Sequence, residues 1–193
     1  VDLVADVIEA IARESGTMAL VQVGINTQAD PDVLNVVSRD ALDYARVRSA
    51  AMVGMRRNEL GQLWPNPNAK WQITESTRDG VRGLVERAVA EGWSNDKLAG
   101  ELRESYQFSK QRAMLIARTE TQMATQAGAL NGYKASGVVD GKQCLTAEDD
   151  KVSEECQANG AVGPHADGVL LDLDAPYPSG DVCPPAHPNC RCS

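Results

Sequence analysis

The sequence predicts a mainly α protein. We expect a helical bundle around a long central helix, about residues 110–136, followed by a small loop-rich C-terminal module with a β-hairpin and a Cys/His cluster. Aromatic residues make up only 4% of the 193 residues, with a single Phe, while apolar residues make up 42%. A core of Leu, Val, Ile and Ala favours closely packed helices. All five cysteines and both histidines lie beyond residue 138. We therefore predict three parts: a helical region and connection (1–72), a helical core (73–138) and an acidic Pro/Cys-rich module (139–193).

The first segment has the apolar spacing of an amphipathic helix. A stripe repeats every three to four residues from position 1 to 13, at Leu3, Val4, Val7, Ile8 and Ile11. We expect Gly16 to end this helix. The next stretch, 18–24, is short, apolar and β-branched, so it suits either a brief strand or a buried turn.

The second helix is predicted to begin at Pro31 with Asp30 as its N-cap, and to run to about Gly54. Residues 58–72 contain two prolines and three asparagines, which interrupt helical periodicity. We interpret them as an exposed connection in which Trp64 and Trp71 are anchored by packing.

Three further helices have recognisable ends. A capping box, Ser76-Thr-Arg-Asp79, predicts a helix to Gly92, and Ser94 caps another to about Tyr106. Ser109 is expected to cap the long helix, and Gly137 to follow its C-terminus. The apolar stripe of the first is Val81, Leu84, Val85 and Ala88, and the buried face of the long helix is predicted as Met114, Ala117, Thr121, Ala124 and Gly128. Small residues allow close helix approach.

The C-terminal module is acidic and rich in proline. Residues 139–193 hold ten acidic and three basic residues, a net charge of −7 out of the −8 of the whole chain, and six of the nine prolines. Such a surface does not favour binding to a phosphate backbone. Segments 144–147 and 168–173 are expected to pair as a hairpin. A loop-rich stretch of this size needs additional stabilisation, either from a bound metal or from packing on the helices.

The cysteines and histidines indicate where a metal cross-link would lie. The motif Cys183-Pro-Pro-Ala-His-Pro-Asn-Cys-Arg-Cys192, with Cys156 upstream, supplies the thiolate and imidazole ligands of a tetrahedral Zn²⁺ site. We predict as ligands Cys156, His187, Cys190 and Cys192, with Cys183 as a substitute and Cys144 in reserve. Cys190 and Cys192 can both bind only if Arg191 turns outward. The odd cysteine count and the lack of a visible export signal favour metal over disulfides. The alternative is that the cysteines are small buried apolar residues beside a hydrogen-bonded His.

Three sequence blocks resemble the phage Mu F-like head morphogenesis family over about residues 73–192. They are Ile116-Ala-Arg-Thr-Glu120 with Gly132-Tyr-Lys-Ala-Ser-Gly-Val138, then 145–156, then Pro184-Pro-Ala-His-Pro-Asn-Cys-Arg-Cys192. Many members have Cys-x-x-Cys after the acidic pair. Here the first of those positions is Ser153, so Cys183 or Cys192 would supply the missing ligand.

The resemblance implies a minor capsid protein that acts in head assembly, with the phage portal protein or the major capsid protein as partner. It implies location in the virion, at the portal vertex or capsid interior, and in the host cytoplasm during assembly. We expect no membrane segment, because no run of about 18 apolar residues occurs. We expect no direct sequence-specific nucleic-acid contact, because the C-terminal module is acidic. We expect no enzyme, because GxSxG, HExxH, Walker A and GxGxxG patterns do not occur. The alternatives are a virion-delivered effector or enzyme whose catalytic module lies outside this fragment, and a zinc-ribbon-like adaptor.

Other polar residues have structural readings. Arg118, beside Glu120 on the long helix, is expected to reach the module and bond carbonyls or Asp149 and Asp150. Those acids, with Glu154 and Glu155, suit either a divalent cation or a solvated turn; the spacing favours the turn. His165 is predicted to be a solvated loop residue.

Overall fold

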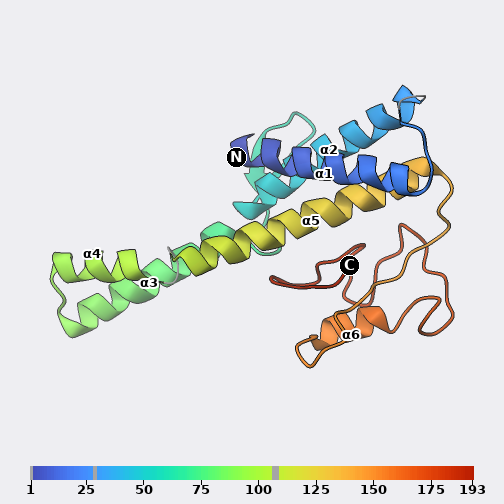
Figure 1. The fold of residues 1–193 in the computed structure, drawn as a ribbon. Coiled ribbons are helices and arrows are strands. Elements are labelled where there is room, and N and C mark those ends of the chain that lie inside the picture. The colour runs from blue at the N-terminus through green and yellow to red at the C-terminus, as the bar shows by residue number, and fades with distance from the viewer. Residues whose placement is uncertain (1, 28–29, 106–108) are drawn as a thin grey trace. The chain divides into compact units, whose positions relative to one another are not determined.

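The computed structural model describes residues 2–27, 30–105 and 109–193. Within these ranges the chain forms six helices and two strands (Figure 1). They are α1 (Asp2–Gln22), α2 (Pro31–Met52), β1 (Met55–Arg57), β2 (Leu63–Pro65), α3 (Ile73–Glu91), α4 (Asn95–Glu104), α5 (Lys110–Ser136) and α6 (Glu154–Gly160). The predicted fold class is confirmed: the chain is mainly helical, and the 27-residue α5 is its longest element.

The chain forms two compact units. One contains residues 46–117, and the other contains residues 2–45 together with 118–193. The candidate site described below lies entirely in the second unit. The division of the chain at residues 72 and 138 that the sequence favours stays a prediction.

A short hairpin occupies the stretch expected to be an irregular connection. β1 pairs antiparallel with β2, with Arg56 opposite Trp64. The Asn58 side chain accepts hydrogen bonds from the amides of Leu60 and Gln62 at 3.0 and 2.9 Å, which closes the turn. Trp64 is 60% exposed, so the predicted anchoring of this ring is wrong. The hydrogen bonds of Asn58 thus support a hairpin turn in a stretch where two prolines had suggested an irregular connection.

Trp71 has the anchored position that was expected for it. It adopts a positive φ of 54°, and the Arg48 guanidinium lies 6.0 Å from its ring centroid. Arg48 is itself buried and donates a hydrogen bond to the Lys70 carbonyl at 3.2 Å. The connection is therefore fastened to α2 at this end.

The capping box at Ser76 is wrong as a helix start. α3 begins three residues earlier, after Gln72, and the hydroxyls of Ser76 and Thr77 accept hydrogen bonds from the guanidinium of Arg112 at 2.6 and 2.8 Å. Arg112 is buried, so it needs these partners. The hydroxyls of Ser76 and Thr77 therefore serve a tertiary contact with Arg112 and do not cap the helix.

The other predicted helix ends around α3 and α4 are confirmed. Gly92 caps α3 in the left-handed conformation, and the Ser94 side chain accepts a hydrogen bond from the Lys97 amide at the start of α4. α4 ends at Glu104, while the predicted end at Tyr106 lies outside the described residues. So do the side chains of Leu3, Val4 and Val81, which belong to the predicted stripes.

In the second unit, α1 continues through Gly16 to Gln22, so the predicted stop at Gly16 and the strand or turn at 18–24 are both wrong. Gly16 lies at a helix contact. A Cβ at this residue would be 2.6 Å from Val37 of α2 and 2.9 Å from the Gly128 carbonyl oxygen of α5. A glycine in a helix interior is tolerated where another backbone needs the space.

The start and end of α5 match the prediction. The Ser109 side chain accepts a hydrogen bond from the Arg112 amide at 3.2 Å, and Gly137 has a φ of 66° just past the last turn. α2 likewise begins at Pro31, with the Asp30 carboxylate accepting from the Val33 amide at 3.4 Å. Local capping chemistry therefore determined these three boundaries.

Only part of the predicted buried face of α5 is buried. Ala124 and Gly128 are buried, whereas Met114, Ala117 and Thr121 are exposed. The buried face follows the small residues that meet α1, where the backbones of the two helices approach closely. Figure 1 shows α1 and α5 lying side by side along this stretch.

The module after α5 contains less β-structure than predicted. Lys142 and Leu171 form one isolated antiparallel bridge. Segment 144–147 does not pair with 168–173; Leu145 instead exchanges two backbone hydrogen bonds with Ser193, at 2.7 and 2.9 Å. The backbone of Leu145 is therefore paired with the C-terminal residue Ser193, and the expected hairpin between 144–147 and 168–173 is wrong.

Candidate metal centre

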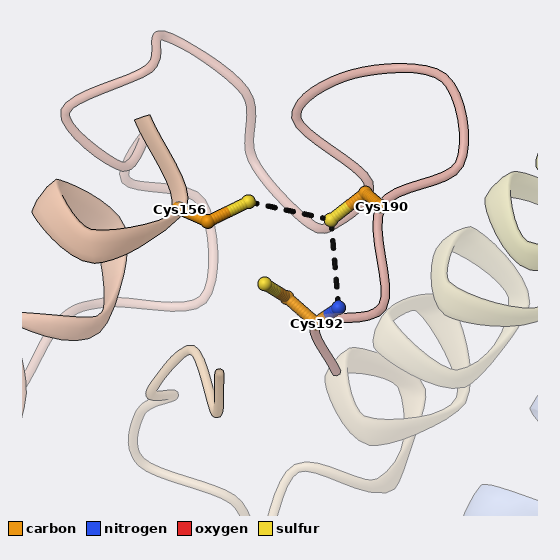
Figure 2. A group of neighbouring side chains, drawn as sticks. All are labelled: Cys156, Cys190 and Cys192. Atoms are coloured by element: carbon orange, nitrogen blue, oxygen red, sulfur yellow. Dashed lines mark hydrogen bonds between the residues drawn. The ribbon is translucent and has the colours of Figure 1, made fainter. Parts of the chain in front are cut away.

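Three cysteines from two distant segments converge in the module. Cys156 is presented by α6, whose N-cap Ser153 accepts a hydrogen bond from the Cys156 amide. Cys190 and Cys192 come from the C-terminal loop. The three sulfur atoms lie within 4.8 Å of one another, and all three residues are buried (Figure 2). A buried group of three thiols can hold a metal ion.

Histidine 187 lies next to this group. Its Nε2 is 3.2 Å from the Cys156 Sγ, and its Nδ1 is 2.9 Å from the Pro188 carbonyl oxygen. Because a carbonyl oxygen can only accept, Nδ1 carries a proton, and in the neutral ring the Nε2 lone pair is then directed at the thiol. This is the tautomer that a histidine needs when it binds a metal through Nε2.

The observed separations agree with those around a tetrahedral ion. Zn–S bonds of about 2.3 Å and Zn–N bonds of about 2.0 Å place neighbouring ligand atoms roughly 3.5–3.8 Å apart. The Cys156 and Cys190 sulfurs are 3.5 Å apart, and the Cys156–His187 pair is slightly closer at 3.2 Å. The three thiols therefore form a group that could hold a metal ion, and His187 lies beside Cys156 but outside the set of ligand atoms that are all within 4.8 Å of one another.

The surroundings of Cys190 and Cys192 shift the pKa values of the two thiols in opposite directions. Burial raises the pKa of Cys190, but hydrogen bonds from the amides of Cys192 and Ala186 and from the Cys156 thiol outweigh it, so the net pKa is lowered. Burial and the neighbouring sulfurs raise the pKa of Cys192. The hydrogen bonds around Cys190 thus favour its thiolate form, which is the form that binds a metal.

The two remaining cysteines do not join the three thiols. Cys144 is buried in the same apolar cluster, together with Tyr177 and Ala186, and burial raises its pKa to about 11. Cys183, the predicted substitute ligand, instead lines a separate cavity of about 430 Å³ with Lys142. Cys144 lies outside the group of three but adjoins it, because its thiol is hydrogen-bonded to the Cys192 side chain.

Helix α5 holds the loop that carries Cys190 and Cys192. The Thr119 hydroxyl accepts a hydrogen bond from the Asn189 amide at 3.1 Å, and Gln122 Nε2 donates to the Cys192 carbonyl at 2.7 Å. Arg118 donates to the Asn189 side-chain oxygen at 3.0 Å. The expectation that Arg118 reaches the module is confirmed, but its partner is Asn189 and not Asp149 or Asp150.

Asp149 is engaged by a different arginine. Both of its carboxylate oxygens accept from Arg191, at 2.6 Å each, and this hydrogen bonding lowers the pKa of Asp149. The pair explains how Cys190 and Cys192 both face inward: Arg191, between them, is drawn outward to the carboxylate. The expected obstacle to using both cysteines is removed in this way.

The other predicted acidic and histidine residues stay at the surface. Glu154 and Glu155 are exposed in the first turn of α6, where carboxylates interact favourably with the helix dipole. Asp150 and His165 are also exposed. The acidic group fits a solvated turn.

A half-buried lysine, Lys142, clamps the module. Lys142 Nζ donates to the carbonyls of Leu173 and Val182 at 2.8 and 2.6 Å, and lies 5.1 Å from the centroid of the Tyr177 ring. Burial lowers its pKa. One signal was available: Lys142 is one of three basic residues in an otherwise acidic module.

Fold and site together define a helical protein that carries a C-terminal module with a buried group of thiols. Residues 79–193 match the model of a single family, described as Phage Mu protein F like protein. The match covers more than half of the sequence and includes the long helix and the whole module. The chain belongs to this family.

Searches of curated proteins and of solved structures returned no match. The family is a structural one of phage head morphogenesis, which places the chain among proteins of virion assembly. Across the described residues, the structure contains no helix with the length and apolar character needed to cross a membrane.

Proposed function

We propose that this protein is a minor capsid component that acts in phage head assembly, at the portal vertex or on the inner face of the capsid. The observation that carries the proposal is the family match over residues 79–193, which spans both the long helix and the thiol-containing module. The role is structural: α5 provides the scaffold and the module provides a compact, acidic surface for contact with the portal or major capsid protein. We expect no catalytic turnover from this chain.

We further propose that the module is held together by one Zn²⁺ ion, with Cys156, His187, Cys190 and Cys192 as its ligands. Support comes from the three buried sulfurs within 4.8 Å of one another and from the His187 lone pair beside Cys156. Bound zinc would act as a structural cross-link, because four protein ligands leave no open position for substrate.

The assembly role is tested by affinity purification of the tagged protein from cells in which heads assemble, followed by mass spectrometry. Recovery of portal or major capsid protein, and of the chain itself in purified heads, supports the proposal. Assembled heads that lack the chain would contradict it.

Metal analysis of the reduced protein tests the zinc site. We expect about one Zn²⁺ per chain, lost in Cys190→Ser and retained in Cys183→Ser, whose thiol lies outside the group. Retention of zinc by Cys190→Ser would rule out these ligands.

A further inference from the structure

To act as a metal site, the loop 187–192 must bring the sulfurs of Cys190 and Cys192 to the same ion. Cys190 and Cys192 are separated by one residue, and in an extended chain residues i and i+2 point to the same side but about 6–7 Å apart. Here their sulfurs lie within 4.8 Å, so the two side chains lean toward each other. The Cys190 amide also donates to the His187 carbonyl at 3.1 Å, so the chain turns just before the two cysteines and needs contacts that hold this turn.

Asn189 is the point at which the loop turns. It has a φ of 61°, in the left-handed region that few residues other than glycine and asparagine adopt. Its amide is directed at the Thr119 hydroxyl, and its side-chain oxygen accepts from Arg118. Both contacts fix the residue that immediately precedes Cys190.

The other side of the loop is fastened to the same helix. Gln122 donates to the carbonyl of Cys192 at 2.7 Å. Residue 122 lies three positions after 119 and four after 118, so all three side chains lie on the same side of α5. None of the three is among the ligand group; each acts on the backbone or the neighbour of a ligand.

We propose that Thr119, Gln122 and Arg118 are positioning residues of the metal centre, and that metal binding is coupled through them to docking of the loop on α5. The inference rests on the proposed zinc site. Hydrogen-bond partners of this kind commonly change metal affinity 10- to 100-fold. By thermodynamic linkage, the factor by which docking strengthens metal binding equals the factor by which metal strengthens docking.

The test measures the Zn²⁺ dissociation constant of the full 193-residue chain under reducing conditions, by competition with a chromophoric chelator. Thr119→Val keeps the side-chain shape and removes the hydroxyl acceptor, so we expect roughly 10-fold weaker binding or more. Thr119→Ser restores the acceptor and should restore affinity. Thr121→Val is the matched control, because Thr121 is exposed on the same helix.

Two further measurements keep the test decisive. Arg118→Gln changes an exposed side chain, so it should fold normally and still weaken zinc binding, while circular dichroism checks the fold of every variant. In the wild type, zinc removal should accelerate hydrogen exchange of the Asn189 amide. Exchange that is the same with and without zinc would overturn the coupling.

The zinc measurements distinguish failure of the coupling from failure of the proposed zinc site itself. If the wild type binds no zinc, the metal centre and the coupling both fall. If the wild type binds zinc and Thr119→Val and Arg118→Gln bind it equally well, the coupling alone is overturned. Equal weakening by Thr119→Val and Thr121→Val would indicate general loss of helix stability and would also overturn it.

Discussion

Two regions of the second unit are held together by different means: the contact between α1 and α5, and the C-terminal module. Between the helices, backbone meets backbone. A Cβ on Gly128 would lie 2.1 Å from the Ala12 carbonyl oxygen, and one on Gly132 would lie 2.3 Å from that of Gly16. In the module, the interior consists largely of four cysteines with one tyrosine, and polar groups close the loops.

The difference shows what each region depends on. The helix contact needs only small residues at fixed positions, because its stability comes from close packing of backbone and small side chains, which are not titratable, redox-active or metal-binding groups. The module buries few large side chains, so it relies on ionic, hydrogen-bonded and thiol groups. Those groups respond to metal, redox state and pH, and the helix contact does not.

The largest expected effect is the loss of metal from the module. Binding of structural zinc to small domains supplies free energy on the order of 10 kcal/mol. Chelation under reducing conditions should therefore make residues 139–193 sensitive to protease while the α1–α5 contact survives. Limited proteolysis with mass spectrometry of the fragments measures this. A module that stays resistant would show that packing alone holds it.

Next in size is the insertion of one methyl group between the helices. Gly128→Ala forces α1 and α5 apart, because the atom that the new Cβ would meet is backbone and cannot rotate away. We expect a loss of about 3 kcal/mol, at the upper end of overpacking effects. Urea denaturation followed by circular dichroism gives the value.

Two further variants serve as comparisons for Gly128→Ala: one at another buried position of α5 and one at a glycine with open space around it. Ala124→Leu, at a fully buried position of the same face, should cost about 1–3 kcal/mol. Gly100→Ala in α4 meets nothing within 4 Å and should stabilise its helix by up to about 1 kcal/mol. Equal effects of Gly128→Ala and Gly100→Ala would contradict the close approach.

A smaller loss is expected when the lysine clamp of the module is removed. Lys142→Met keeps much of the side-chain volume but leaves the carbonyls of Leu173 and Val182 without their donor, at a cost of about 1–3 kcal/mol. The rate of proteolysis within the module in low urea reports the change. Lys151→Met removes the same charge from an exposed position and should have little effect.

The smallest effect concerns the exposed Asp149–Arg191 pair and its dependence on pH. Hydrogen bonds from Arg191 and from the Lys151 amide lower the pKa of Asp149 in the folded state. The stabilisation is therefore present above the unfolded pKa, about 3.9, and is lost as the pH falls through the lower folded value. Arg191→Gln should flatten this loss in unfolding curves between about pH 2 and 6.

Asp140→Asn serves as the control for the pH experiment, because Asp140 is exposed in the same module. It should leave the acid-dependent part of the unfolding curve as in the wild type. An Arg191→Gln variant with wild-type acid sensitivity would show that other carboxylates, such as Asp174 beside Lys134, dominate the response.

Several features were predictable because they depend on neighbours in sequence. Ser94, Ser109 and Gly137 mark helix ends through hydrogen bonds or backbone conformations that span only a few residues. The cysteines of the candidate site stood out for a similar reason: a metal site draws on few residue types, and all of them occur in one stretch. The resemblance to the family rested on the same local blocks and is confirmed.

Other features were out of reach because their partners lie far along the chain. Gly16 is a stop signal by local rules, yet its partner Gly128 is 112 positions away. Ser76 has the spacing of a cap but serves the buried Arg112. Arg118 was correctly directed to the module, although its partner Asn189 could not be chosen among the module's many oxygen atoms.

The amino-acid sequence by itself determined the helical class, several helix boundaries, the family and the residue types of the thiol group. These follow from periodicity, capping and composition, which act over a few residues. Only the tertiary structure decided which cysteines meet, that Lys142 and Asn189 hold the module, and that glycines join α1 to α5. Such contacts depend on which surfaces exclude water together and which buried polar groups find partners, and both are properties of the folded chain as a whole.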